Sequence, residues 1–240
     1  MVEKEEKDRL ELRPVEFELD YNVHAEGSCL ASMGETRVLC TATVEQRVPP
    51  FLEGKGQGWV TAEYGMLPRS THSRQQRERS RSGANSRALE ISRLIGRALR
   101  IAVDLESLGE RTVILDCDVI QADGGTRCCA INGAVVALYK ALSRLAEQGE
   151  LEPDPMTGLI AAVSVGLVDG NLVLDLDYEA DSRAEVDMNV VMTASGELVE
   201  IQGTAENKPF GQSELNEMLS LARSGIEKLI TIQKKVLGIE

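Results

Sequence analysis

Both halves of this 240-residue chain run from strand-like alternation into a long amphipathic helix, and this repeated order constrains the fold more than any other feature. Strands whose apolar face is covered by helices define an α+β protein. The chain is long enough for one sizeable core or for two small coupled halves. We therefore expect a single compact domain over residues 1–240, with similar halves at about 10–150 and 151–240 whose sheets are joined.

The first half is predicted to form a three-stranded meander, a long loop, a helix, a strand and a second helix. In chain order these are Val15–Tyr21, Ser28–Met33, Thr36–Val44, Glu45–Asn85, Ser86–Asp104, Thr112–Gln121 and Thr126–Gln148. The second half is predicted to form two hairpins and a closing helix, at Ile160–Val168 with Leu172–Asp177, Val186–Thr193 with Glu197–Gln202, and Ser213 to just before Gly238. Turn residues and apolar stripes at helical spacing support these boundaries.

An arginine-rich band lies between Arg69 and Arg100, where nine arginines stand against two acids. The whole chain is acidic, with 26 Lys and Arg against 39 Asp and Glu, so this positive charge is local. Arginine suits phosphate and carboxylate because its donors form a fixed, planar fork. We expect a mobile, anion-binding loop over residues 66–85. The alternative is a solvated loop or a network of salt bridges.

Two arginines, Arg87 and Arg127, fall in the first turns of the two helices predicted for the first half. A cation there is unfavourable, because the amino end of a helix already carries positive dipole charge and unpaired N–H donors. A bound phosphate would offset that charge, and Gly124-Gly125 would let the backbone approach it. Thr126 would add a hydroxyl at the N-cap position. The alternative partners for these arginines are carboxylates, namely Asp123 or those of the Asp181 region.

An acidic segment between two predicted strands of the second half contains Asp175, Asp177, Glu179, Asp181, Glu185 and Asp187. Strand periodicity puts Asp187 on one face together with Asn189. If that face looks toward the helices, two carboxylates with open positions suit Mg²⁺ beside a phosphate, and one of them can donate or receive a proton. We single out Asp181 and Asp187 as candidate catalytic groups and metal ligands. The alternative is a solvated acidic hairpin edge.

The remaining composition argues against several classes of protein. Five cysteines without paired spacing indicate reduced, buried thiols, and two histidines do not provide for a zinc site. The charged start of the chain lacks the apolar run of a signal peptide, and no apolar stretch reaches the roughly 18 residues that span a bilayer. We therefore expect a cytoplasmic protein without a membrane partner.

Several motifs, in order along nearly the whole chain, resemble the ribonuclease PH family. They are Gly58–Arg69 (GWVTAEYGMLPR), Arg93–Arg97 (RLIGR), Gln121–Arg127 (QADGGTR), Val186–Thr193 (VDMNVVMT) and Gln202–Glu206 (QGTAE). The resemblance implies two βαβα halves of the ribosomal protein S5 domain 2-like type within one ribonuclease PH domain. It also implies a homohexameric ring, built as a trimer of dimers, that trims the 3′ ends of transfer RNA precursors.

The resemblance also implies roles for single residues. Inorganic phosphate, the co-substrate, is expected at Arg87, Gly125, Thr126 and Arg127. Asp181 and Asp187 are expected to be the acidic catalytic pair and to bind Mg²⁺. Arg69, Arg74 and Arg77, with Arg79 and Arg81 beside them, are expected to grip the RNA. We expect Arg93, Arg97 and Arg100, spaced along one helix, to make structural or interfacial ion pairs.

The implied reaction is phosphorolysis. Bound phosphate attacks the terminal phosphodiester, releases a nucleoside diphosphate and leaves a shortened 3′ hydroxyl. Because a phosphoanhydride replaces a phosphodiester, the reaction should also run backward as a tRNA nucleotidyltransferase activity. Two alternatives belong to other classes: a ring subunit that binds RNA without catalysis, and a hydrolytic nuclease that releases monophosphates.

Overall fold

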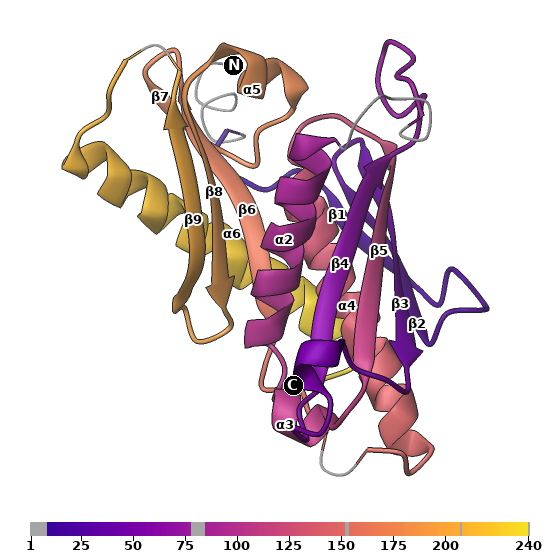
Figure 1. The fold of residues 1–240 in the computed structure, drawn as a ribbon. Helices are drawn as coiled ribbons and strands as arrows, with labels where there is room; N and C mark the ends of the chain where they lie inside the picture. Colours follow the sequence, from indigo (N-terminus) through magenta and orange to yellow (C-terminus); the bar gives the residue numbers. More distant parts are fainter. Residues whose placement is uncertain (1–8, 78–84, 152–153, 207, 240) are drawn as a thin grey trace.

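The computed structural model describes residues 9–77, 85–151, 154–206 and 208–239. Its described part contains two separate β-sheets with helices between and behind them (Figure 1). The first sheet has five strands in the order β1-β2-β3-β5-β4. Their bounds are β1 Val15–Leu19, β2 Gly27–Met33, β3 Thr36–Glu45, β4 Trp59–Met66 and β5 Thr112–Gln121. All neighbouring strands are antiparallel except β4 and β5, which run parallel.

The second sheet has four antiparallel strands in the order β7-β6-β8-β9. Their bounds are β6 Ile160–Val168, β7 Asn171–Leu174, β8 Ala184–Thr193 and β9 Leu198–Ala205. Every residue of β6 is buried, which means that both faces of this strand are covered. Two-sided burial explains why β6 reads as a nearly continuous apolar run and not as an alternating one.

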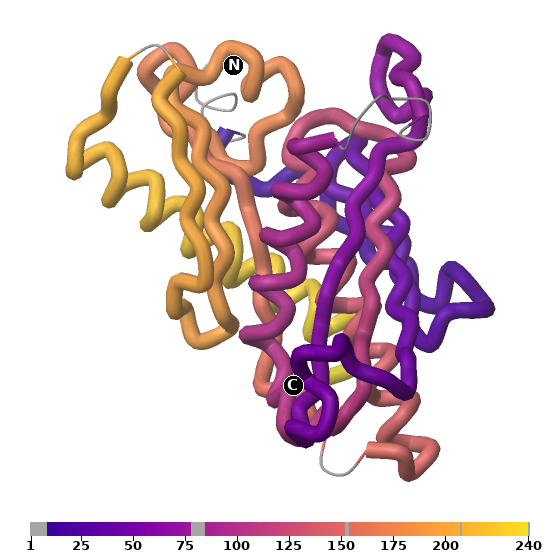
Figure 2. The backbone as a smooth tube through the Cα atoms, viewed as in Figure 1, coloured from indigo at the N-terminus to yellow at the C-terminus, as the bar shows by residue number. Residues whose placement is uncertain are grey.

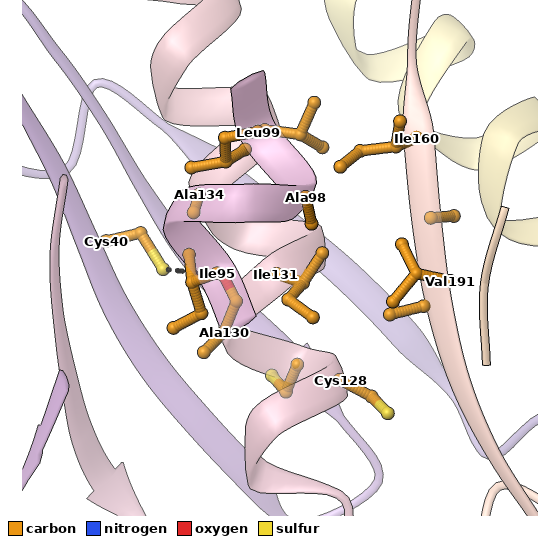
Figure 3. Close-up of a cluster of buried hydrophobic side chains, with 14 of the residues drawn as sticks. Cys40, Ile95, Ala98, Leu99, Cys128, Ala130, Ile131, Ala134, Ile160 and Val191 are labelled. Carbon is orange, nitrogen blue, oxygen red and sulfur yellow. Dashed lines mark hydrogen bonds between the residues drawn. The ribbon is translucent and has the colours of Figure 1, made fainter. Parts of the chain in front are cut away.

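Two helices, α2 (Ser86–Ile101) and α4 (Thr126–Glu147), lie between the sheets, and α6 (Gln212–Leu237) covers the other side of the second sheet (Figure 1). Figure 3 shows the apolar contact between the layers, with side chains from α2 and α4 facing β6 and β8. Its labelled members include Ile95, Leu99, Ile131, Ile160 and Val191, all of which are buried. The core therefore joins the two halves through helices.

The α+β class is confirmed, but the expectation of joined sheets is wrong: no strand of one sheet pairs with a strand of the other in the described residues. Each half nevertheless follows the order strand, helix, strand, helix. In the first half that order is β1 to β4, α2 with the short α3 (Leu105–Leu108), β5 and α4. In the second half it is β6 and β7, the short α5 (Tyr178–Arg183), β8 and β9, and α6.

The prediction of one long loop over residues 45–85 is also wrong in part. This segment contains a 3₁₀ turn, Pro50–Leu52, and the whole of β4. Val60, Ala62 and Tyr64 point inward from β4 at strand spacing and are buried. Glycines flank this run closely, and its pairing partner β5 begins at Thr112, 46 residues after β4 ends at Met66. A parallel strand that depends on so distant a partner has no hairpin signal of its own.

One helix, α4, is long and apolar enough to cross a membrane by length and composition, contrary to the expectation that no stretch of this size exists. It is a core helix instead, since 78% of the apolar stretch is buried inside the protein. The cysteine prediction is confirmed: Cys29, Cys40, Cys117, Cys128 and Cys129 are all free and buried.

Candidate active site

The amino ends of α2 and α4 lie at the same end of the molecule, where α5 and the segment after β4 also lie (Figure 2). Asn85 caps α2, as predicted, and its side chain accepts a hydrogen bond from the backbone N–H of Ala88 at 3.4 Å. Neither helix has an acidic residue in its first turn. No carboxylate in the same first turn therefore offsets the charge of Arg87 or Arg127, as the sequence suggested.

The turn before α4 differs from the prediction in one respect. Gly125, in the left-handed conformation at φ 62°, is the N-cap, and Thr126 is the first helical residue. The Thr126 hydroxyl instead accepts a hydrogen bond from the Tyr64 hydroxyl at 2.9 Å. Burial raises the pKa of Tyr64, while the charges of Arg87 and Arg127 act in the opposite direction. The charges of both arginines therefore act on this tyrosine, which was not among the predicted site residues.

The turn before α4 requires glycine at positions 124 and 125. Both residues have left-handed backbone angles, and the turn is tightly packed. A Cβ on Gly124 would come within 2.5 Å of the backbone carbon of Asp177, so the turn lies directly against the segment that leads into α5. The hydroxyl of Thr36 holds the same turn, accepting from Asp123 N at 2.8 Å and donating to Gly124 O at 2.7 Å. The glycines thus bring the start of α4 against the second half of the chain.

Asp181 lies on α5, which the sequence analysis did not predict as a helix. Its pKa is raised, first by burial and then by the nearby charge of Asp187, with a smaller contribution from Glu206. The positive charges of Arg87 and Arg127 oppose this rise. The structure therefore brings the two predicted arginines and the two predicted aspartates close enough for their charges to act on one carboxyl group.

Asp187 and Asn189 share one face of β8, as the strand period predicted, while Val186, Met188 and Val190 are buried on the other. The face carrying Asp187 looks toward the helices, because the Asn189 side-chain oxygen accepts from the Cys128 thiol of α4 at 3.2 Å. This places Asp187 on the site side of the second sheet.

Arg127 does pair with a carboxylate, that of Glu90. This partner is neither Asp123 nor a carboxylate of the Asp181 region, which were the alternatives expected from the sequence. Nη1 of Arg127 donates to Gln202 Oε1 at 2.7 Å and lies 3.5 Å from Glu90 Oε1. For Arg87, the described residues contain no hydrogen-bond or ion-pair partner. Glu90 comes from α2 and Gln202 from β9, so their approach to Arg127 depends on the packing of the two halves and leaves no local signal in the sequence.

The three other helix arginines behave differently from one another. Arg97 forms the predicted ion pair, with its Nη2 2.8 Å from Glu200 Oε1 of β9. Arg100 instead stacks over the Trp59 ring at 4.3 Å and donates to the Val60 carbonyl at 2.8 Å. Arg93 is exposed and has no ion-pair partner among the residues that the structure describes.

The loop arginines Arg69, Arg74 and Arg77 are exposed on the segment that follows β4. Arg69 donates to the carbonyl of His72 at 2.9 Å, and the His72 ring lies 6.1 Å from that of Tyr178 on α5. The segment is therefore held beside α5, near Asp181. Arg79 and Arg81, also expected to grip RNA, lie outside the described residues, as do the other residues of 78–84 in the predicted mobile loop.

Asp181 and Asp187 could hold a divalent metal ion. Within the described ranges no cluster of three or more His, Cys, Asp or Glu side chains could hold a metal, so a pair of carboxylates is what the site offers. Two oxygen ligands fit Mg²⁺, which binds through one or two carboxylates and keeps several of its waters beside phosphates. The mutual repulsion of the two carboxylates would also be relieved by a cation.

Family models match most of the chain. Domain 1 of the 3′ exoribonuclease family matches residues 11–142, and domain 2 of the same family matches residues 158–225. The chain belongs to the 3′ exoribonuclease family. This confirms the resemblance to ribonuclease PH, whose family also includes exosome core subunits.

Solved structures with the same fold include rice Rrp46 and two archaeal exosome structures. Rrp46 from rice (Oryza sativa) superposes with a TM-score of 0.77 at 15% identity, covering 98% of this chain and 99% of that one. The Archaeoglobus fulgidus exosome with RNA bound to the active site gives 0.77 at 20% identity, covering 92% and 88%. An archaeal exosome core gives 0.76 at 20% identity, covering 94% and 88%. At these identities the likeness shows a shared fold.

Proposed function

We propose that this family member is a phosphorolytic 3′ to 5′ exoribonuclease that trims the 3′ ends of transfer RNA precursors and other RNA. One observation carries the proposal. The charges of Arg87 and Arg127, on two helix amino ends, and of Asp187, on β8, all influence the pKa of the Asp181 carboxyl group, so the four residues share one site. Such a site has a positive part for an anion and a negative part for a metal or a proton.

Inorganic phosphate would bind at the amino end of α4. The backbone N–H groups after Gly125 and the hydroxyl of Thr126 can donate to its oxygens, and Arg127 can grip it with two prongs. Arg87, which has no partner among the described side chains, is free to complete the site from α2. A phosphate there would remove the unfavourable combination of two cations and two helix dipoles.

In the reaction, an oxygen of bound phosphate attacks the phosphorus of the terminal phosphodiester, and the bond to the preceding 3′ oxygen breaks. The products are a nucleoside diphosphate and an RNA shortened by one nucleotide, whose 3′ oxygen takes up a proton. Arg87 and Arg127 would stabilise the charge that develops on the phosphate oxygens. Asp181 and Asp187 would hold Mg²⁺, which when bound neutralises phosphate charge as a Lewis acid.

RNA would be held by Arg69, Arg74 and Arg77 on the segment beside α5. Phosphate contacts position a nucleic acid without reading its bases, so low sequence specificity is expected. Transfer RNA precursors as the physiological substrate, a homohexameric ring and a cytoplasmic location belong to the same proposal. Support for an RNA-binding ring comes from the fold, which the chain shares with exosome structures, one of them with RNA bound.

The deciding assay supplies RNA that carries extra 3′ nucleotides, together with Mg²⁺, with and without inorganic phosphate. Release of nucleoside diphosphates only when phosphate is present is the expected result. Release of monophosphates without phosphate would replace the proposal with a hydrolytic nuclease. Absence of release in both conditions would leave a ring subunit without catalysis. Light scattering on the purified 26.1 kDa chain tests the six-subunit assembly separately.

A further inference from the structure

The guanidinium of Arg127 is engaged by two acceptors of the protein itself. Gln202 Oε1 accepts from Nη1 at 2.7 Å, and the Glu90 carboxylate lies 3.5 Å from the same nitrogen. The first partner is neutral and close, and the second is charged and more distant. Arg127 is largely buried, with a side-chain exposure of 21%, while Glu90 is 43% exposed. An anion that binds Arg127 must therefore compete with Glu90.

Gln202 is itself held in one orientation. Its amide nitrogen donates to Glu90 Oε1 at 3.0 Å and to Glu200 Oε1 at 3.1 Å, and Glu200 is fixed by Arg97. Since the amide N–H₂ faces two carboxylates, the amide oxygen must face Arg127. Reversing the amide would set N–H donors against a guanidinium. The network thus determines that Nη1 is the guanidinium nitrogen of Arg127 that donates to Gln202.

We propose that Gln202 is a positioning residue that aims Arg127, and that Glu90 is an internal competitor that the incoming phosphate displaces from it. The inference rests on the proposed function only in naming phosphate as the anion. Phosphate outcompetes Glu90 because it carries up to two charges and can use the helix N–H donors as well. Glu90, on a half-exposed side chain, forms a weak pair that is readily given up.

Two substitutions with opposite expected signs test this. Glu90→Gln keeps the shape and the acceptor for Gln202 but removes the competing charge, so phosphate should bind more tightly. Gln202→Glu adds a second carboxylate beside Arg127, so phosphate should bind more weakly. A network with a merely structural role would respond to both substitutions in the same direction. The matched control is Glu106→Gln, which removes the same charge from exposed α3, at the opposite end of the molecule (Figure 1).

The measurement is a calorimetric titration of the full chain with inorganic phosphate, without RNA, after thermal unfolding has shown that each variant is folded. We expect the Kd of Glu90→Gln to fall by about twofold to fivefold, the size of one exposed ion pair. The Kd of Gln202→Glu should rise by at least as much, and that of Glu106→Gln should stay unchanged. An unchanged or higher Kd for Glu90→Gln overturns the inference, and so does wild-type protein that binds no phosphate.

Activity separates this inference from the proposed function. In the phosphorolysis assay, Glu90→Gln should lower the KM for phosphate and leave kcat nearly unchanged. If the wild type binds phosphate and the two Kd values shift in opposite directions, but no nucleoside diphosphate forms, the proposed function fails and the inference stands. If the wild type is active and the Kd of Glu90→Gln is unchanged, only the inference fails.

Discussion

Arg13 and Asp175, which are 162 residues apart in sequence, form a paired clamp between the two halves of the molecule. The guanidinium donates to both carboxylate oxygens, at 3.0 Å from Nε and 2.7 Å from Nη2, and the Arg13 backbone N–H adds a third bond at 3.1 Å. Nη1 of the same side chain donates to the carbonyl of Asp123 in the turn before α4. One largely buried arginine thus ties the turn of the proposed phosphate site to the segment that leads to Asp181.

This clamp predicts a large loss of stability for Asp175→Asn. Asp175 is only 2% exposed, and removing one charge of a buried pair leaves the other without compensation, at a cost of about 3 kcal/mol. Asp169→Asn is the matched control: it also has a positive φ and an arginine partner, Arg183, but both side chains are more than half exposed. Urea unfolding should show a loss below about 1 kcal/mol there. Equal losses would mean that burial of the clamp has no role.

A second prediction concerns the close contact of Gly124. Gly124→Ala meets two costs: a left-handed backbone, at about 1–2 kcal/mol, and a Cβ within 2.6 Å of the Leu176 carbonyl oxygen. Gly170→Ala meets only the first, because its φ is also 74° and nothing lies within 4 Å of the added Cβ. Chemical denaturation should therefore rank Gly124→Ala as the less stable variant by about 1–3 kcal/mol. The same variant should also bind phosphate more weakly, since the start of α4 must move.

Arg87→Ala should reduce phosphate-dependent release of nucleoside diphosphates by a factor on the order of 10² to 10³, the usual cost of losing one donor to a developing charge. Stability should change little, because Arg87 makes no hydrogen bond or ion pair within the described residues. Arg93→Ala removes an exposed arginine from the same helix and serves as the control. A rate loss of similar size in both variants would point to the general charge of α2 and not to a phosphate contact.

Asp187→Asn should retain RNA binding and lose turnover. The substitution removes a charge from the site side of β8 without changing the shape of the side chain, and the proposed RNA contacts lie on the segment after β4. Fluorescence polarisation with single-stranded RNA and a single-turnover assay at saturating RNA measure the two properties separately. A parallel loss of affinity and rate would instead assign Asp187 to RNA binding.

Local signals in the sequence were sufficient for the three long helices and for the hairpins. Asn85 precedes a clear apolar stripe, and the alternation in Val186–Thr193 correctly gave the face that carries Asp187. The strand β4 was missed because its partner lies far along the chain, and α5 was missed because a six-residue helix is too short to show a period.

The partners of the site residues could not be predicted for a related reason. Gln202, Glu90 and Tyr64 reach the site from three different elements, and their contacts depend on how α2 and α4 pack between the sheets. No local spacing indicates a partner for Arg13, and its carboxylate partner follows more than half the chain later. Such contacts are set by tertiary packing and not by local spacing.

The division of the candidate site between the two halves of the chain has a consequence for the newly made protein. During synthesis on the ribosome, the arginines of α2 and α4 emerge well before Asp181 and Asp187 have been translated. At that stage the first half carries Arg87 and Arg127 of the proposed phosphate site, while Asp181 and Asp187 are still absent. Only when β6 and β8 pack against α4, and α6 closes behind them, do the charges of both signs come together. On the proposed function, the nascent chain would therefore acquire its phosphate-binding arginines before it acquires its catalytic carboxylates.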